Sequence, residues 1–279
     1  MSAATAVTAA PSEPASIPTM VGDALAALGD WSAFSLRAIR GIFSRDFKLR
    51  EVLAAAISIG TGSIMVVAIT GTFIGMVLAV QAYSQFHQVG LDTSLGAVIH
   101  MSVVRELGPV LTAVMLAGRV GSAMAAQLGT MKVTEQLDAL ACLGVDPVRF
   151  LVAPRLVACV LVIPLLTVLA DVMGLAGSSL MCLRVFGIDS HHYWEHTREF
   201  VGLWDLFDGL IKVTFFGGVL SLIACHRGFH SKAGAEGVGK AATESFVFSF
   251  IAILAIDFVL GLLSNGLHTM IWPPNNKMM

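Results

Sequence analysis

The sequence contains little charge for its length. Asp, Glu, Lys and Arg together make up 13% of the 279 residues, whereas hydrophobic residues make up 56%. A soluble domain usually carries about 25% charged residues. The 17 Lys and Arg are balanced by 19 Asp and Glu, and no basic stripe follows the chain, so a nucleic-acid-binding surface is excluded. The scarcity of charge predicts an integral membrane protein.

Cysteine is also scarce, and no pair of cysteines has the C-x-x-C spacing of a metal or redox site. Thiols within apolar segments are usually buried and unreactive. We therefore expect buried free thiols at the four positions, which are Cys142, Cys159, Cys182 and Cys225.

The first twenty residues lack the basic and apolar regions of a secretory signal peptide. They are rich in Ala, Ser, Thr and Pro, a composition that predicts a disordered cytoplasmic tail over 1–20. The folded domain would then extend over 21–279.

Long hydrophobic runs, in contrast, are abundant. Five stretches are long enough to cross about 30 Å of hydrocarbon as helices. They extend over about 52–83, 96–128, 150–183, 206–225 and 245–272. Pro164 lies inside the third stretch and is expected to kink it. The predicted fold is an all-α integral membrane protein with five transmembrane helices.

An amphipathic segment precedes the first run. Apolar residues recur at helical spacing from Val21 to Phe34, and five Arg and Lys residues follow before position 51. Such a pattern favours an interfacial helix lying on the membrane over 21–50. An ordinary soluble helix packed on the domain also fits the pattern.

The basic residues are sorted along the chain. They gather before the first run, between the second and third runs, and between the fourth and fifth, while the first connection has none. Cytoplasmic loops of membrane proteins carry an excess of Lys and Arg. The sorting predicts a cytoplasmic N-terminus and a C-terminus on the outside.

Small residues follow two of the runs. Gly71 and Gly75 form a G-x-x-x-G pattern, and the second run carries a nearly continuous small face. This face consists of Gly118, Gly121, Ser122, Ala125, Ala126 and Gly129. Small residues let helix backbones approach closely in lipid. The pattern fits packing within the chain or a close subunit contact beside a transport pathway.

Several polar residues fall at membrane depth, where bare charge is costly. The second run contains Arg105, Glu106 and Arg119. Neighbouring residues of a helix point about 100° apart, so Arg105 and Glu106 are not expected to pair only with each other. Pro109 should loosen the helix one turn later. Asp171, Lys212 and Asp257 extend the set, either as a structural network or as a lining for a substrate with a charged head.

The connection between the second and third runs, 130–143, is amphipathic. Leu137, Leu140 and Leu143 form an apolar stripe, and Glu135 and Asp138 project from another side. A short cytoplasmic helix between two long spans fits a lever that docks on a partner. A connecting helix packed on the bundle fits as well.

Two segments resemble catalytic motifs. Residues 234–241 read GAEGVGKA, which lacks the final Ser or Thr of a P-loop and follows a membrane run, so a flexible loop is favoured. Residues 192–196 read HYWEH, in which His192, Glu195 and His196 have the spacing of a zinc hydrolase site. No third ligand is evident, and a polar surface helix is favoured. A membrane zinc hydrolase remains an alternative.

The runs RELGPVLTAVMLAGRVGSAMAAQLGTMKVTEQLDAL, GVDPVRFLVAPRLVA and GAEGVGKAAT resemble the MlaE/YrbE permeases. These are membrane subunits of ABC transporters that work with MCE-domain proteins in lipid trafficking, and the resemblance extends from Val21 to the C-terminus. It implies an N-terminal elbow helix, five transmembrane helices and a homodimer. It also implies a cytoplasmic ATPase that holds ATP and Mg²⁺, a STAS-domain partner and a periplasmic MCE ring.

The resemblance assigns roles to particular residues. It implies a coupling helix for the ATPase, formed by Thr134, Glu135, Gln136, Leu137, Asp138 and Leu140. It also implies that Arg105 and Glu106, with Arg119 as a further intramembrane polar residue, belong to a lipid pocket at the dimer interface. Gln127 stands where an acidic residue is common, and Lys240 where Arg is common.

The function implied by the resemblance is that of a phospholipid permease in the bacterial inner membrane. It would exchange lipid with the MCE carrier, maintain outer-membrane lipid asymmetry and have no catalytic site or cofactor of its own. A secondary transporter that couples ion flow to the buried charges is a further alternative. Against it, the sequence shows no internal repeat of the inverted kind.

Overall fold

Long helices form a bundle in the computed structural model, which describes residues 17–43, 48–89, 95–191, 193–194, 197 and 202–271. Every regular element among them is helical. The elements in chain order are α1 (Ile17–Ile42), α2 (Leu49–Val89), α3 (Leu95–Ser102), η2 (Val103–Leu107), α4 (Gly108–Leu116), η3 (Ala117–Gly121), α5 (Ser122–Val133), α6 (Gln136–Cys142), α7 (Pro147–Leu180), η4 (Met181–Val185), α9 (Leu203–Phe229) and α10 (Gly234–Ile271). The three η elements are π-helical turns.

Five of the helical stretches are long and apolar enough to cross a membrane. They are Leu49–Gln88, Leu95–Val133, Pro147–Val185, Trp204–Phe229 and Gly234–Ser264. The second includes α3, α4 and α5 with the two π-turns between them. The predicted all-α fold with five spans is confirmed, and each span is longer than the hydrophobic run that predicted it.

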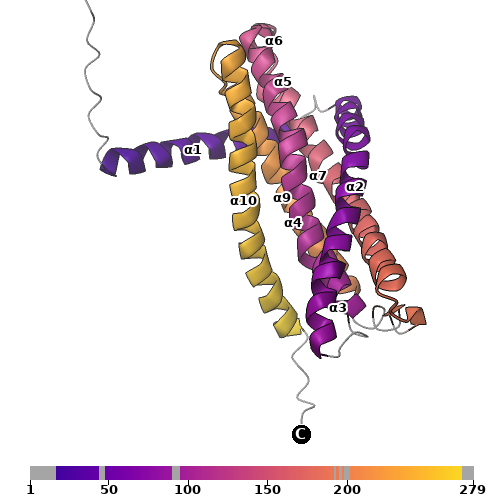
Figure 1. Cartoon of the computed structure of the whole chain (residues 1–279). Helices are drawn as coiled ribbons and strands as arrows, with labels where there is room; N and C mark the ends of the chain where they lie inside the picture. The colour runs from indigo at the N-terminus through magenta and orange to yellow at the C-terminus, as the bar shows by residue number, and fades with distance from the viewer. Residues whose placement is uncertain are drawn as a thin grey trace, which may run out of the picture.

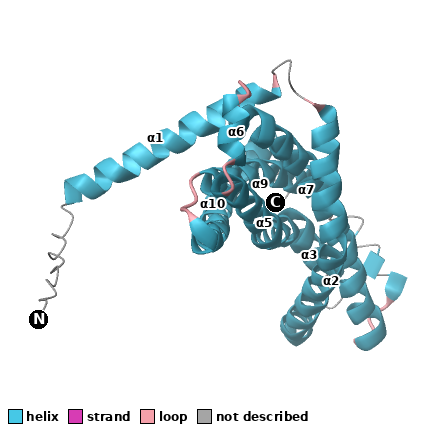
Figure 2. Ribbon diagram, turned by 90° about the horizontal axis from the view of Figure 1, so that it is seen from above, coloured by secondary structure: helices cyan, strands magenta, loops and turns pink. Residues whose placement is uncertain are grey.

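The spans pack around α9. α9 contacts α7, α5 and α10, while α2 packs along α7 on the far side (Figures 1 and 2). Phe216 and Leu220 of α9 are fully buried and share one core with Ile163 of α7 and Leu116 of α4. α6 lies at one end of this bundle and α3 at the other (Figure 1).

Glycines bring α2 and α7 into backbone contact. A Cβ added at Gly75 would overlap the carbonyl oxygen of Gly174, and one at Gly71 would lie 2.6 Å from the carbonyl oxygen of Ala170. Gly177 of α7 meets Thr72 in the same way. The G-x-x-x-G pattern therefore serves a close helix contact within the chain.

The small face of the second span packs on α9 and α10. Ser122 Oγ donates a hydrogen bond to the carbonyl oxygen of Ala242 at 3.1 Å. A Cβ at Gly129 would lie 3.2 Å from Ser231 Oγ, and one at Gly228 would lie 2.7 Å from Leu128 Cβ. Of the two interpretations of this face, the structure supports packing within the chain.

Prolines act differently in the second and third spans. The π-turn η2 immediately precedes Pro109, so the predicted loosening of the helix at this place is confirmed. α7 instead continues as one uninterrupted helix through Pro154 and Pro164.

The structure corrects the prediction for 234–241. This segment is not a loop, because α10 begins at Gly234 rather than near position 245. Ala241 and Gly237 are buried, and a Cβ at Gly237 would overlap the backbone of Lys232. Close packing at the α9–α10 turn thus stabilises helical turns that hydropathy alone does not reveal.

One cysteine also departs from expectation. Cys159, Cys182 and Cys225 are buried free thiols, as predicted, but Cys142 is exposed. Cys142 is the last residue of α6, outside the apolar spans that bury the other three.

α1 lies across the bundle rather than along it, and its first half extends away from the other helices (Figures 1 and 2). Its second half packs mainly on α7, where Phe34 and Ala38 are buried and a Cβ at Gly41 would lie 3.1 Å from Arg149 Cα. The predicted segment 21–50 is corrected at both ends, because the helix extends from Ile17 to Ile42. Residues 1–16 of the predicted tail lie outside the described residues.

Candidate functional site

Lys212 is the centre of a charged cluster inside the bundle. It lies on α9 and is 1% exposed. Its Nζ is 2.9 Å from Glu106 Oε1, 3.7 Å from Asp208 Oδ2 and 3.8 Å from Asp257 Oδ1. An ammonium group at this depth needs such partners, because the alternative is an unpaired charge in a medium of low dielectric. The cluster therefore links the second span to α9 and α10.

Arg105 supplies the second cation of the Lys212 cluster. Its guanidinium lies 4.0 Å from Asp205 Oδ1 and 3.9 Å from Asp208 Oδ2. The π-turn η2 carries Arg105 and Glu106 side by side, and both reach charged residues of α9. The prediction that they do not pair only with each other is confirmed.

The Lys212 cluster combines two cations with four carboxylates, so acidic groups are in excess. The members are Arg105, Glu106, Asp205, Asp208, Lys212 and Asp257. Glu106 is the most open of them, with a side chain that is 46% exposed, compared with 9% for Asp208. One edge of an otherwise buried polar cluster thus reaches the surface of the chain.

Asp171 approaches the second span close to this cluster. A Cβ at Gly108 would overlap the Asp171 carboxylate, so only glycine leaves space for it. Asp171 is 5% exposed, and its Oδ1 has no hydrogen-bond partner among the described residues. The glycine of the R-E-L-G-P motif, Gly108, is therefore required for steric reasons.

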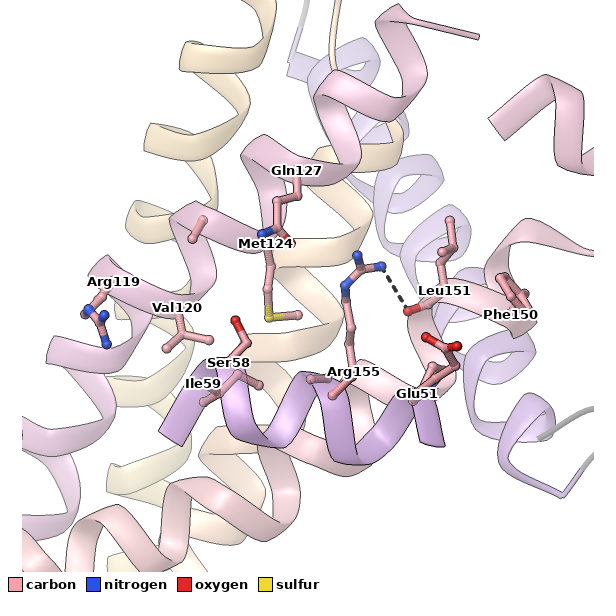
Figure 3. A pocket seen from close by; sticks show the side chains of 14 residues that line it. Glu51, Ser58, Ile59, Arg119, Val120, Met124, Gln127, Phe150, Leu151 and Arg155 are labelled. Atoms are coloured by element: carbon pink, nitrogen blue, oxygen red, sulfur yellow. Dashed lines mark hydrogen bonds between the residues drawn. The ribbon is translucent and has the colours of Figure 1, made fainter. Parts of the chain in front are cut away.

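Arg119 lies elsewhere, in a cavity of about 400 Å³ between α2, the second span and α7. Its Nη1 donates to Ser63 Oγ at 2.6 Å, and a Cβ at Gly62 would overlap its guanidinium. Arg155 of α7 also lines the cavity and donates from Nη1 to the carbonyl oxygen of Leu151 at 3.1 Å (Figure 3). The structure thus separates Arg119 from Arg105 and Glu106.

Gln127 is a neutral residue in the lining of this cavity. Its amide and the Arg155 guanidinium both point into the space (Figure 3). The charged residues of the lining are Arg119, Arg155 and Glu51, which leaves an excess of positive charge. An acidic residue at position 127 would cancel that excess, so the departure from the family pattern has an electrostatic consequence.

The predicted coupling segment 130–143 is two helices with a bend. α5 ends at Val133, and Glu135 adopts φ 59°, a left-handed conformation, before α6 begins at Gln136. The prediction of one helix over 130–143 is therefore wrong in its bounds, and the short helix between the two spans is α6. The predicted apolar stripe is also divided, because Leu137 is buried and Leu140 half-buried, whereas Leu143 is 78% exposed.

The tip around α6 presents mixed chemistry to its surroundings. Thr134, Glu135, Gln136 and Asp138 are all exposed. Asp146 caps the following helix, because its side chain accepts a hydrogen bond from the backbone N–H of Val148 at 3.0 Å. A rigid cap on α7 and a short α6 together hold this exposed surface at the end of two spans.

Of the two segments that resemble catalytic motifs, the structure describes all of 234–241 but only part of 192–196. Lys240 lies on a helix, 65% exposed and 3.9 Å from Glu244, and a membrane span precedes it where a P-loop needs a strand. His192, Glu195 and His196 lie outside the described residues, and the hydrolase alternative stays untested.

Comparison with known proteins settles the family. A family model described as "Permease MlaE" matches residues 52–263. The chain belongs to the MlaE permease family. With its five membrane-length helices, it is a multi-pass membrane protein of the ABC transporter permease class.

Curated relatives of this MlaE-family chain span most of its length. A probable ABC transporter permease protein of Rickettsia typhi is 40% identical over 233 residues, covering 84% of this chain and 90% of that protein. The intermembrane phospholipid transport system permease protein MlaE of Haemophilus influenzae is 38% identical over 203 residues, 72% of this chain and 78% of the relative. The chloroplastic protein TRIGALACTOSYLDIACYLGLYCEROL 1 of Arabidopsis thaliana is 37% identical over 235 residues, 82% and 67%.

Sequence reasoning missed part of both sites. Sequence analysis assigned no role to Asp205, Asp208 or Arg155, which the structure brings into the two sites. The spacing of Asp205, Asp208 and Lys212 places all three on one face of a helix, which is the signal that could have found the cluster. No comparable sequence pattern predicts the cavity, because the residues that line it come from three separate segments.

Proposed function

We propose that this chain is the membrane subunit of an ABC transporter that moves phospholipids between the bacterial inner membrane and a periplasmic MCE-protein carrier. The name of the Haemophilus influenzae relative supports phospholipid as the substrate. In this proposal two copies form the permease, and a separate cytoplasmic ATPase binds ATP and Mg²⁺. An MCE ring and a STAS-domain protein complete the assembly, which maintains outer-membrane lipid asymmetry.

The observation that carries the proposal is the exposed α6 tip between two long spans. α6 lies at the bundle end that also holds the α9–α10 turn (Figure 1). Leu143 and Asp138 are exposed there, which gives an apolar contact and a charge for docking into a groove of the ATPase. Basic residues gather at this end, in line with a cytoplasmic location.

The Lys212 cluster is proposed to line the lipid pocket. η2 follows α3 directly, so the cluster lies in the half of the bundle away from α6. Glu106 opens to the chain surface beside α10, where a second copy or a lipid head can reach it. A zwitterionic headgroup carries both charges that this cluster can pair.

The second span is the proposed route between the two places. It joins the α6 tip to the cluster through α5, η3, α4 and η2, and the π-turns are points where the helical hydrogen-bond ladder changes. Nucleotide-driven motion of the ATPase would move α6, and the two arrangements of the span would bind lipid differently. Transport requires such a difference in affinity between states.

The proposal is tested with the permease reconstituted in proteoliposomes with its ATPase. We expect Asp138→Lys and Glu135→Lys to lower lipid transfer on the order of 5- to 150-fold, the span of typical coupling free energies. Both variants should retain their fold and reduce ATPase binding. Transfer and binding at the wild-type level in both variants would contradict the assignment of α6.

A matched variant separates charge from backbone at Glu135. Glycine adopts the left-handed conformation without strain, so Glu135→Gly removes the carboxylate and preserves the bend. Reduced transfer in Glu135→Gly assigns the effect to the carboxylate. Wild-type transfer in Glu135→Gly, with loss in Glu135→Lys, assigns it to the introduced charge.

A further inference from the structure

A cluster of three metal-ligating side chains joins α1 to the end of α9. Asp30 comes from α1, His226 lies in the last turn of α9, and His230 is the C-cap residue that follows α9. Asp30 Oδ2 lies 3.0 Å from His226 Nε2 and 3.5 Å from His230 Nε2. One ligand atom from each residue lies within 4.8 Å of the other two. The cluster is separate from the Lys212 cluster and from the Arg119 cavity.

Hydrogen bonding fixes the protonation of one ring. His230 Nδ1 is 2.9 Å from the backbone carbonyl oxygen of His226, and a carbonyl oxygen only accepts, so Nδ1 carries a proton. In a neutral ring, Nε2 of His230 is then an acceptor that faces the Asp30 carboxylate, another acceptor. A proton or a metal ion placed between these two acceptors, which are 3.5 Å apart, would bind both of them.

We propose that Asp30, His226 and His230 bind a divalent transition-metal ion, with zinc as the best match. Bonds of about 2.0–2.1 Å in a tetrahedron place ligand atoms roughly 3.3 Å apart, and the two distances to Asp30 lie on either side of that value. Two histidines and one carboxylate are a common zinc donor set, and water would take the fourth position. The carbonyl bond to His230 Nδ1 is the supporting contact that metal-bound histidines usually make.

The surroundings favour a preformed site. Phe34, one turn after Asp30 on α1, packs edge-on against the rings of His226 and His230, with centroids 5.3 Å and 6.4 Å away. The hydrogen bond with His226 holds the pKa of the Asp30 carboxyl below its usual range, so this ligand is ionised at neutral pH. Zinc would replace the proton on His226 Nε2 and tie the part of α1 beyond its contact with α7 to the bundle.

The test uses the full-length chain in detergent, stripped with a chelator and titrated with zinc alone by calorimetry. We expect one zinc per chain. Cobalt(II) in place of zinc should give the visible absorption of a tetrahedral site. Asp30→Asn and His230→Gln should each weaken zinc binding by more than the roughly 10- to 100-fold that loss of a supporting contact costs. Unchanged affinity in both variants, or no stoichiometric zinc, would overturn the proposal.

Two controls locate the metal. His87→Gln removes a histidine near the C-terminal end of α2, which does not contribute to the cluster. The double variant His192→Gln and His196→Gln removes the HYWEH histidines. Both proteins should bind zinc like the wild type, and loss of zinc in the second would place the metal in that segment. Zinc should also slow hydrogen exchange in α1 of the wild type but not of Asp30→Asn. These readouts do not depend on lipid transport.

Discussion

α2 and α10 both run the length of the bundle, but they are held in opposite ways. α2 meets α7 backbone to backbone through Gly71 and Gly75. Of the apolar stretch within α10 only 11% is buried, compared with 28% of the apolar stretch within α2. Among the polar contacts that hold α10 are Asp257 with Lys212 and the carbonyl of Ala242 with Ser122. The comparison indicates a fixed α2–α7 pair and an α10 that is open to lipid or to a second copy.

Substitution of Lys212 should have the largest effect on stability, because it removes the ion pair that joins α10 to α9. Lys212→Met leaves Glu106, Asp208 and Asp257 without their shared cation. Breaking a buried ion pair from one side costs about 3–5 kcal/mol, so we expect the free energy of unfolding to fall by that amount. Equilibrium unfolding in mixed micelles measures it.

Lys232→Met is the control for this change, because Lys232 is exposed at the α9–α10 turn. It should alter stability by less than about 0.5 kcal/mol. If Lys212→Met were equally harmless, the cluster would not hold α10, and the comparison would rest on packing alone.

Alanine substitution of single glycines should sharpen the contrast between the two helices. In Gly75→Ala the new Cβ overlaps the carbonyl oxygen of Gly174, so the helices must separate, and we expect a loss of about 1–3 kcal/mol. Gly239 of α10 has no atom within 4 Å of the Cβ position. Gly239→Ala should therefore stabilise the chain by up to about 1 kcal/mol through helix propensity. The same sign in both variants would contradict the contrast.

Much of this architecture could be predicted from the sequence, because membrane spans are encoded locally by hydropathy. The five spans and the loosening at Pro109 follow from length, composition and one residue type. The start of α10 could not be predicted, because residues 234–241 are small or polar and become helical through packing of Gly237 and Ala241. The bend at Glu135 also escapes prediction, because glutamate rarely adopts positive φ.

Asp146, the N-cap residue of α7, allows a local test of how α7 is stabilised. Asp146→Ala removes the N-cap acceptor for Val148 N–H and should cost about 1 kcal/mol. Asp146→Asn keeps an acceptor and loses only the 3.2 Å ion pair with the half-exposed Arg149, so its effect should be much smaller. Thermal unfolding of the two variants side by side measures the difference. Equal losses would assign the stabilisation to charge rather than capping.

The candidate site was predictable only in part, because side-chain pairing between distant segments is a tertiary property. Arg105, Glu106 and Lys212 could be recognised as polar residues at depth, since charge is rare there. Their pairing could not, because the contacts between spans join residues far apart in the sequence, such as Lys212 and Glu106, which are 106 positions apart. The hydrogen bond from Arg119 to Ser63 could not be predicted for the same reason.

Ser249 of α10 should give the smallest effect and the most specific information. It is fully buried, and its hydroxyl has no hydrogen-bond partner among the described residues. Ser249→Ala removes an unsatisfied polar group, so the stability of the isolated chain should be unchanged or slightly higher. Ser122→Ala, which removes the donor to Ala242, should cost about 0.5–1.5 kcal/mol.

The proposed homodimer extends this test. Ser249 is fully buried within the chain, so neither a second copy nor a lipid reaches its hydroxyl, and Ser249→Ala should also leave the assembly unchanged, as native mass spectrometry would detect. A loss of stability in the isolated chain would instead mean that the Ser249 hydroxyl is hydrogen-bonded within it. α10 would then be held more firmly than its shallow burial indicates, and its contrast with α2 would narrow.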